Sequence, residues 1–401
     1  MGTVTGNPRL LCLFRALQMA LFPMAIYAVF LTRELGFTMT QLMVLQAGFG
    51  ATVVLCEFPS GYLADRLGYR RTLCLASIVM IAGWSIYSVG SSFPVLLMGE
   101  VFLAIGTSLI SGADVALLYE SLEETDQADR FTHWNGLWRA WGQGAEGSAA
   151  LLAGLLFAWW ARAPFVVQLL AWSLALVVAW RLVEPDRVRP PATGNWQQVK
   201  GMLRLAWHER PRLRAIIVLM TTFGMSSFVP VWIVSVYAKD AGLPDAWLGV
   251  LWALANYSVA AGALLSSRLE RRLGLGLMLG VATALVALGY FGLALTHALG
   301  GFVFYYAITF MRGLLGPVLD REEQQLLPSG ERAGFVSLRG LVFRGSFLVI
   351  GPVVGRGVDH HGEHVMLLVL GIGLTLACTA TSVWFLRLRA AAAAREAAAR
   401  D

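Results

Sequence analysis

The chain contains repeated apolar stretches of about 20 residues, the first starting near Leu10 and the last ending near Leu386. Each stretch is long enough to cross the hydrocarbon core of a bilayer, about 30 Å thick, as an α-helix. Spanning segments are helices or closed barrels, and barrel strands are shorter and alternate in polarity. We therefore predict transmembrane helices. The twelve stretches are centred near Phe22, Val53, Ile81, Gly106, Gly147, Trp172, Met225, Trp252, Leu285, Ile308, Leu348 and Ile372.

The composition excludes an ordinary soluble domain. Of the 401 residues, 57% are hydrophobic and 14% are charged, whereas about a quarter of the residues of a soluble domain are charged. The mean hydropathy is +0.64. The 4 cysteines are isolated from one another within predicted helices, so neither a disulfide framework nor a zinc site is expected. No basic surface interleaved with aromatic residues suggests nucleic-acid binding.

The basic residues outside the apolar stretches are divided unequally between alternate loops. One set of loops carries many of them, as in Arg66–Arg71 and Arg268–Arg272, whereas the other set carries few, such as Arg33 and Lys239. Loops rich in Lys and Arg stay in the cytoplasm. We therefore predict that both termini are cytoplasmic. The near-absence of Lys fits a bacterial source, so the expected location is the bacterial cytoplasmic membrane.

A shift of 202 positions superimposes the ends of corresponding stretches without a gap, and it places Arg66 on Arg268 and Arg130 on Arg332. The alternative is a chance alignment of equally spaced stretches. A shift by six helices preserves helix direction, so the halves are expected to be parallel repeats about an axis along the membrane normal. The predicted fold class is an all-α polytopic membrane protein with twelve transmembrane helices in two parallel-repeat six-helix bundles.

The one long polar stretch separates the two halves and begins with a Pro-rich segment. We predict an N-terminal six-helix bundle at residues 1–183, a cytoplasmic linker at 184–212, a C-terminal six-helix bundle at 213–388 and a cytoplasmic tail at 389–401. The linker includes a basic amphipathic segment of the kind that lies on lipid headgroups. The tail is rich in Ala and Arg and is expected to be helical and attracted to anionic lipid.

A charged loop follows the second apolar stretch and reads Gly-Tyr-Leu-Ala-Asp-Arg-Leu-Gly-Tyr-Arg-Arg. It resembles the signature G-x-L-a-D-r-x-G-r-r/k of the major facilitator superfamily, a class of twelve-helix secondary transporters. The resemblance implies that the loop joins the second and third helices in the cytoplasm, and that Asp65 docks near the start of helix eleven and favours the outward-open state. The matching positions are Gly61, Asp65, Arg66, Gly68, Arg70 and Arg71.

Ionisable residues at membrane depth are costly and usually face a cavity or a partner. At 1.5 Å per residue, Arg15, Glu57, Asp114 and Arg139 lie roughly 9–10 Å from the cytoplasmic boundary. Two acids and two bases at one level are consistent with a static ion-pair layer. They are also consistent with proton coupling, because a carboxylate that is alternately wet and dry changes its proton affinity. Our candidates for the coupling acid are Asp114, Glu57 and Glu146.

The sequence around two of these acids carries a second resemblance. Glu57–Gly61 reads Glu-Phe-Pro-Ser-Gly, and Ser111–Asp114 reads Ser-Gly-Ala-Asp and continues to Tyr119 and Glu120. Both patterns are similar to a bacterial subgroup of facilitator transporters that is functionally mixed, so they indicate no substrate. The proline can bend the second helix beside Glu57.

The family's geometry implies that helices one, four, seven and ten surround the substrate cavity and that helix two packs against helix eleven. Arg312 and Arg344 lie roughly 12 and 15 Å deep in the C-terminal half, and no acid is expected at that depth there. Arginines in a cavity favour an anionic or carboxylate-bearing solute, whereas a lone carboxylate favours a cation. The cavity candidates are Arg15, Gln18, Asp114, Arg139, Gln143, Asn256, Arg312 and Arg344.

Two departures from the family limit what the resemblance implies. Glu100 stands roughly where many members have an arginine, so their proton-relay argument does not transfer. The fifth helix lacks the Gly-Pro pair often associated with antiporters. Separately, His360, His361 and His364 form a predicted outward loop with imidazoles suited to a transition metal. An exposed polar turn is favoured there, because a fourth buried ligand is missing, and we predict no metal.

The favoured function is secondary active transport of a small organic solute by rocking of two bundles around a central site. We expect proton coupling, contact with membrane lipid, a monomer and no cofactor, and we favour efflux of an amphipathic or anionic solute. The first alternative is uptake of a nutrient or a metal complex. A polytopic membrane enzyme is disfavoured because no nucleophile, base and metal groups gather at one membrane face. A non-transporting receptor is disfavoured by the intramembrane acids.

Overall fold

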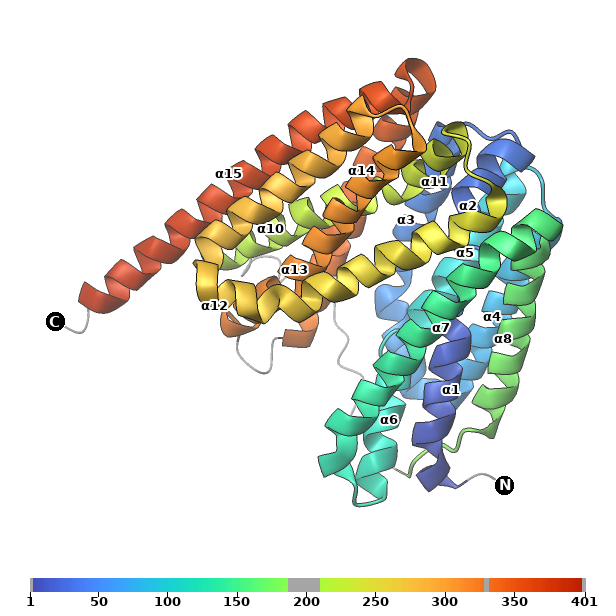
Figure 1. Ribbon diagram of the computed structural model, residues 1–401. Helices are drawn as coiled ribbons and strands as arrows, with labels where there is room; N and C mark the ends of the chain where they lie inside the picture. The colour runs from blue at the N-terminus through green and yellow to red at the C-terminus, as the bar shows by residue number, and fades with distance from the viewer. Residues whose placement is uncertain (1–2, 187–209, 328–331, 399–401) are drawn as a thin grey trace. The chain divides into compact units, whose positions relative to one another are not determined.

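The computed structural model describes residues 3–186, 210–327 and 332–398, and every regular element in these ranges is a helix (Figure 1). The chain divides into two compact units. Unit 1 comprises Met1–Gly194 and Pro244–Ala253, and unit 2 comprises Asn195–Leu243 and Leu254–Asp401. Each unit is described by itself below. The predicted amphipathic linker segment falls on residues 187–209, outside the described residues.

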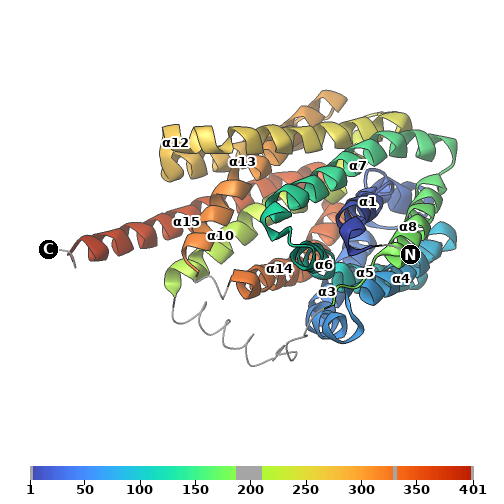
Figure 2. The same ribbon diagram turned by 90° about the horizontal axis from the view of Figure 1, so that it is seen from below.

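Unit 1 contains long helices joined by short loops. Its first span is interrupted between α1 and α2 and ends in the π-helical turn η2, and its fourth span is interrupted between α5 and α6. The helices are α1 (Asn7–Met19), α2 (Tyr27–Val29), η2 (Phe30–Glu34), α3 (Met39–Leu67), α4 (Tyr69–Val89), α5 (Phe93–Ile110), α6 (Ala113–Glu124), α7 (Phe131–Trp159) and α8 (Ala163–Arg181). α4 lies beside α5 and α8 in both views (Figure 1, Figure 2).

Unit 2 is built in the same way, although the turn η5 (Asp245–Trp247) and the start of α12 belong to unit 1. Its helices are α10 (Pro211–Phe228), α11 (Val231–Asp240), α12 (Leu248–Leu295), η6 (Leu299–Phe302), α13 (Val303–Gln325), α14 (Arg332–His361) and α15 (Glu363–Ala398). α12 is two helices in series, because Gly274 has a φ of 71°, a conformation that glycine adopts without steric penalty. α15 continues past residue 388 into the tail that we predict to be helical.

The all-α polytopic fold class is confirmed. In the described residues, 9 helices are long and apolar enough to cross a membrane. One of them, Asp245–Leu295, contains two of the predicted centres, Trp252 and Leu285, on either side of Gly274. The two remaining predicted spans correspond to the interrupted α1–η2 segment and to α7, which carries several polar residues. The shift of 202 positions carries α7 onto residues 333–361, within one residue of α14.

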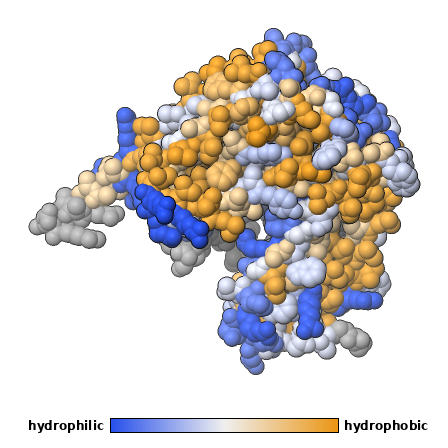
Figure 3. Space-filling view, viewed as in Figure 1, coloured by the Kyte–Doolittle hydropathy of each residue, from blue (hydrophilic) through white to orange (hydrophobic). Residues whose placement is uncertain are grey.

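The surface has the polarity expected of helices in lipid. Figure 3 shows broad hydrophobic areas along the helices and hydrophilic residues gathered near helix ends. Individual large side chains are strongly exposed, among them Leu55 at 75%, Trp159 at 80% and Leu264 at 79%. Exposed apolar surface on this scale is not stable in water, so these faces contact the hydrocarbon of the bilayer.

Close helix contact within unit 2 depends on two glycines at the crossing of α12 and α13. A Cβ added at Gly262 would overlap the carbonyl oxygen of Phe310, and one added at Gly313 would overlap that of Val259. Small residues let two backbones approach in this way, and the approach strengthens helix packing in membranes. Ser266 adds a hydrogen bond from its hydroxyl to the carbonyl of Leu314, at 2.8 Å. The two helices are therefore packed as a close pair.

Candidate functional site

Asp114 occupies a break in the fourth span of unit 1. Gly112 has a φ of 85°, so α5 ends before it and α6 begins at Ala113. The break places Asp114 in the first turn of α6, where free N–H groups and the positive end of the helix dipole stabilise an anion. Its Oδ1 accepts a hydrogen bond of 2.8 Å from the N–H of Val115, and the residue is 3% exposed. Asp114 is thus a buried acid held at a helix start.

Arg15 of α1 is the cation that interacts electrostatically with Asp114. Its guanidinium lies 4.1 Å from the ring centroid of Trp138, a cation–π distance, and its Nη1 donates to Oε1 of Gln18 at 3.0 Å. Gly142 makes room for it, since a Cβ there would come within 3.1 Å of the Arg15 Nε. Within the described residues, that buried Nε has no hydrogen-bond acceptor. Arg15 therefore retains one donor that a bound anion or a water molecule can use.

Three further candidates lie on α7 within about two turns of each other. Arg139 and Gln143 are exposed, Glu146 is half-buried, and Gln143 Nε2 donates to Glu146 Oε2 at 3.4 Å. Arg139 and Glu146 both act electrostatically on Arg15. The structure therefore brings together six of the predicted residues, which we call the Arg15 site. Its members are Arg15, Gln18, Asp114, Arg139, Gln143 and Glu146.

The other predicted acid, Glu57, lies on α3. It is half-buried, and its backbone carbonyl accepts a hydrogen bond of 3.0 Å from the hydroxyl of Ser60. The expected packing of helix two, which carries Glu57, against helix eleven, which carries Arg344, stays a prediction. In unit 2, Arg344 on α14 and Asn256 on α12 are half-buried, and Arg312 on α13 is exposed.

The charged loop motif ends α3 and begins α4. Gly68 makes the turn with a φ of 90°, and Arg66 and Gly61 are exposed on α3. Arg70 donates from Nη2 to the carbonyl of Trp180 at 2.8 Å, which ties the start of α4 to the end of α8. Arg71 is exposed. The side chain of Asp65 lies outside the described part, so its docking stays a prediction.

Glu184 is a partner of this loop that we did not identify from the sequence. Its two carboxylate oxygens accept the N–H groups of Tyr69 and Arg70 at 2.8 and 2.7 Å. A carboxylate on the free N–H groups of a helix start is stabilised by both the hydrogen bonds and the helix dipole. The available signal was the position of Glu184 just after the sixth apolar stretch. The sequence does not show that the start of α4 lies beside Glu184, and its role follows from that contact.

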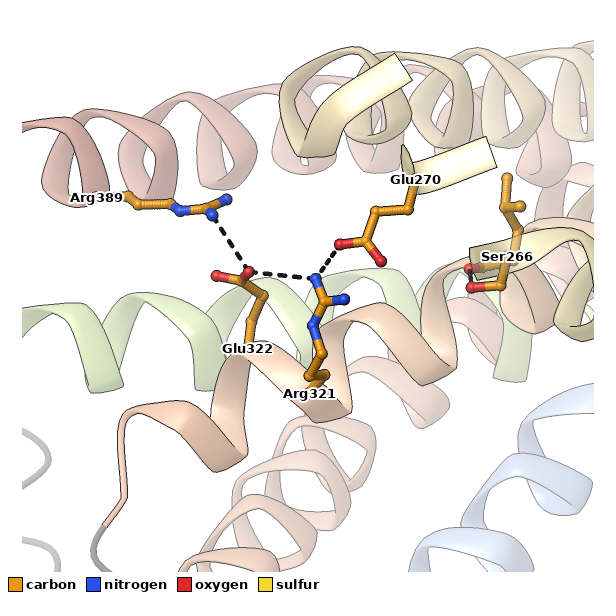
Figure 4. A network of polar contacts seen from close by, with 6 residues as sticks. Ser266, Glu270, Arg321, Glu322 and Arg389 are labelled. Carbon is orange, nitrogen blue, oxygen red and sulfur yellow. Dashed lines mark hydrogen bonds and ion pairs between the residues drawn. The ribbon is translucent and has the colours of Figure 1, made fainter. Parts of the chain in front are cut away.

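Unit 2 contains a charge network where α12, α13 and α15 meet (Figure 4). Glu322 lies 3.5 Å from Arg389 and 3.9 Å from Arg321, and Arg321 also pairs with Glu270. The sequence did not predict this network. The repeat offered a hint, because the same shift that relates the halves places Glu120 on Glu322. The network joins three helices by charge.

A second ion pair connects α14 to α13. The Nη1 of Arg339 lies 3.0 Å from Oε2 of Glu323 and 2.8 Å from Oδ1 of Asp320. The side chain of Glu323 is 1% exposed, whereas that of Asp320 is 59% exposed. The buried pair therefore depends on a single partly exposed arginine.

Glu100 forms another cluster that the sequence did not predict. It is 3% exposed, and its Oε1 accepts hydrogen bonds from the hydroxyls of Tyr27 and Tyr87 and from the amide of Gln46. The sequence identified Glu100 only as a departure from the family pattern. The four residues come from α2, α3, α4 and α5, so the cluster depends on how these helices face each other.

Among the described residues, the histidine loop included, no group of three or more His, Cys, Asp or Glu side chains is arranged to hold a metal ion. His364 packs its ring 3.9 Å from that of His297, and its Nδ1 lies 3.2 Å from the carbonyl of Ala294. His360 and His361 are exposed.

Solved structures with similar folds include transporters. The nucleoside transporter NupG, in a mutant form, is 12% identical, covers 94% of this chain and 100% of its own, and superposes with a TM-score of 0.81. A POT family transporter in complex with 5-aminolevulinic acid is 14% identical, covers 96% of each chain, and superposes with a TM-score of 0.75. At these identities the similarity shows the fold alone.

Similarity in sequence extends over a shorter region. The quinolone resistance protein NorA of Staphylococcus aureus is 21% identical over 209 residues, which are 52% of this chain and 52% of the relative. The chain therefore spans about half the length of the curated relatives it matches. The family model described as Major Facilitator Superfamily matches residues 10–320. Because that match covers well over half of the sequence, the chain belongs to the major facilitator superfamily.

Proposed function

We propose that the protein is a secondary active transporter that moves a small organic solute across a bacterial cytoplasmic membrane by alternating access, in exchange for protons. The observation that carries the proposal is Asp114, a buried acid at a helix break beside Arg15. An acid in a site that opens alternately to the two sides of the membrane can take a proton from one side and release it to the other. The nearby guanidinium offers a counter-charge when the proton leaves.

The chemistry of the Arg15 site supports an anionic or amphipathic solute. Arg15 has one buried donor free for an acceptor, and the exposed Arg139 and Gln143 add a second cation and an amide. Trp138 supplies an aromatic wall. A few convergent polar groups beside an aromatic surface are typical of sites for small organic ligands. Asn256, Arg312 and Arg344 stay our substrate-cavity candidates in unit 2, and Glu57 and Glu146 are the secondary candidates for the proton carrier.

Efflux is the proposed direction. It is supported by the relative named for quinolone resistance, although that match covers half of each protein. The alternative, uptake, is supported by fold similarity to proteins named as nucleoside and POT family transporters. We further propose that the Gly61–Arg71 loop controls exchange between conformations, and that the transporter works as a monomer.

Flux in proteoliposomes tests the function. A thermal-shift screen of organic anions and amphipathic compounds identifies a ligand. The purified protein is then reconstituted into vesicles, and uptake of that ligand into the vesicles is measured. We expect an imposed pH gradient to drive its accumulation against its own gradient, and a protonophore to abolish that accumulation. Vesicles that respond to a sodium gradient but not to a pH gradient would contradict proton coupling. Equilibration of the ligand with no response to either gradient would contradict active transport.

The predicted orientation of the protein in the membrane, with both termini in the cytoplasm, can be tested separately. In a variant lacking Cys12, Cys56, Cys74 and Cys378, we expect Ser92→Cys to react with an impermeant maleimide added to intact cells. Asp129→Cys should react only after the membrane is opened. Both side chains are exposed, so a difference in labelling reports the side of the membrane and not burial. Labelling of Asp129→Cys in intact cells would reverse the proposed orientation.

A further inference from the structure

The cluster around Glu100 has an unusual arrangement of oxygen atoms. Oε1 of Glu100 lies 2.5 Å from the hydroxyl oxygens of both Tyr27 and Tyr87. Those two hydroxyl oxygens lie 2.7 Å from each other. Three oxygen atoms therefore form a closed triangle with every side at hydrogen-bond distance.

Gln46 contacts the triangle from outside. Its Nε2 lies 2.9 Å from the hydroxyl oxygen of Tyr27 and 3.1 Å from Oε1 of Glu100. An amide nitrogen carries two hydrogens and acts here as the donor in both contacts. Gln46 therefore satisfies lone pairs of the triangle but places no hydrogen on any of its three sides.

In the part of the chain that the structure describes, no cation pairs with the cluster's carboxylate. Arg162, which lies at the C-terminal end of α4, donates to the backbone carbonyls of Tyr87, Ser88 and Gly90 and to the hydroxyl of Ser91, and not to the Glu100 carboxylate. The ring of Tyr87 stacks on Phe165 with centroids 5.7 Å apart, so an aromatic wall closes one side. An ionised carboxylate here would be a buried charge without a counter-ion, which is costly.

A count of hydrogens decides between the two protonation states. Three sides of the triangle need three hydrogens, and the two phenols supply one each. An ionised carboxylate supplies none, which would leave two oxygens in contact with no hydrogen between them. A protonated carboxyl supplies the third. Its O–H can then donate to Tyr27, Tyr27 to Tyr87, and Tyr87 back to Glu100, in a ring where each oxygen donates once.

We infer that Glu100, Tyr27, Tyr87 and Gln46 form a proton-binding site, separate from the Arg15 site, that holds one proton on the Glu100 carboxyl in this conformation. Release of the proton to solvent removes one hydrogen from the ring and leaves a negative charge beside two phenolic oxygens. The strain is relieved by separating the oxygens or admitting water. Because the members sit on α2, α3, α4 and α5, the site links proton binding to the packing of these four helices.

Infrared spectroscopy of the purified protein, without substrate or gradient, tests this inference. We expect the wild-type protein at neutral pH to show the C=O band of a neutral carboxylic acid, and Glu100→Gln to lack it. Gln is neutral and has nearly the shape of the protonated carboxyl, so this variant buries no charge, but its NH2 group donates without accepting and cannot complete the ring. We therefore expect it to fold with a melting temperature that no longer depends on the protonation of residue 100. The matched control is Glu123→Gln, which changes an exposed acid and should leave the band in place.

Two further variants keep the inference testable if Glu100→Gln does not fold. Tyr27→Phe and Tyr87→Phe each remove one hydrogen of the ring, so each should shift the carboxyl band to a different frequency.

The melting temperature should fall with rising pH more steeply in the wild type than in Glu100→Gln, because folding of the wild type requires one additional bound proton. A wild-type spectrum identical to that of Glu100→Gln would overturn the inference. So would a melting temperature that follows sodium concentration in place of pH. Neither outcome bears on transport by the Arg15 site.

Discussion

Asp114→Asn should abolish accumulation driven by a pH gradient while solute binding and solute exchange continue. Asn has nearly the shape of the protonated acid but can neither release nor accept a proton. The variant therefore behaves as a carrier fixed in one protonation state, which can exchange solute down its gradient but cannot couple to protons. The measurement is proteoliposome uptake with and without an imposed pH gradient, together with counterflow of labelled solute. Asp129→Asn, which changes an exposed acid, should transport like the wild type.

A structural role of Asp114 predicts a different result for the same variant. If the acid serves only to neutralise Arg15, its removal leaves a partly buried guanidinium without its counter-charge. Breaking a buried pair in this way costs roughly 3–5 kcal/mol, so the melting temperature should fall sharply and binding should fall with it. Normal melting combined with full proton-driven transport would contradict both roles. Glu57 and Glu146 would then be the next acids to test.

Arg339→Met should be the most destabilising single change in unit 2 among its surface arginines. It removes the cation from Glu323, whose side chain is 1% exposed, and leaves a buried charge alone. The expected loss is roughly 2–4 kcal/mol, somewhat below the 3–5 kcal/mol typical of a fully buried pair, because the side chain of Arg339 is itself 25% exposed. Thermal unfolding in detergent measures it.

A double variant separates the charge from the packing. Glu323→Gln removes the buried charge, so Arg339→Met combined with Glu323→Gln should recover much of the stability lost in Arg339→Met alone. Arg395→Met, at an exposed position of α15, is the matched control and should change stability by less than about 0.5 kcal/mol. Equal melting temperatures for Arg339→Met and Arg395→Met would show that the pair contributes no net stability.

Much of the helical framework is predictable from the sequence because lipid imposes a simple rule on composition. A run of about 20 apolar residues must be a helix in a bilayer, and the repeat carries the bounds of α7 onto those of α14. Interruptions inside a span follow a different rule. The breaks after Met19 and at Gly112 depend on local backbone angles, and hydropathy averaged along the chain does not detect them.

The sequence predicts how deep in the membrane the residues of the candidate site lie, but it does not predict which of their side chains touch. Counting residues from a helix end places Arg15 and Asp114 at one level, and the two do interact, although their role in coupling stays a prediction. The same count says nothing about which faces of two helices meet. Glu100 contacts residues 73, 54 and 13 positions away in the chain. Recognising that cluster requires the rotation of each helix about its own axis, which the sequence of one chain does not specify.

The interruption at Gly112 divides the fourth span into two rods, and each rod carries one buried acid. Glu100 lies on α5 and Asp114 on α6, about 20 Å apart along a continuous helix of that length. In an unbroken helix, torque applied at one acid would turn the other, because the hydrogen-bond ladder resists local twist. Here the ladder is interrupted by the left-handed backbone of Gly112. We therefore expect each half of this membrane span to respond to its own acid, so that gain or loss of a proton at Glu100 or at Asp114 tilts one rod without turning the other.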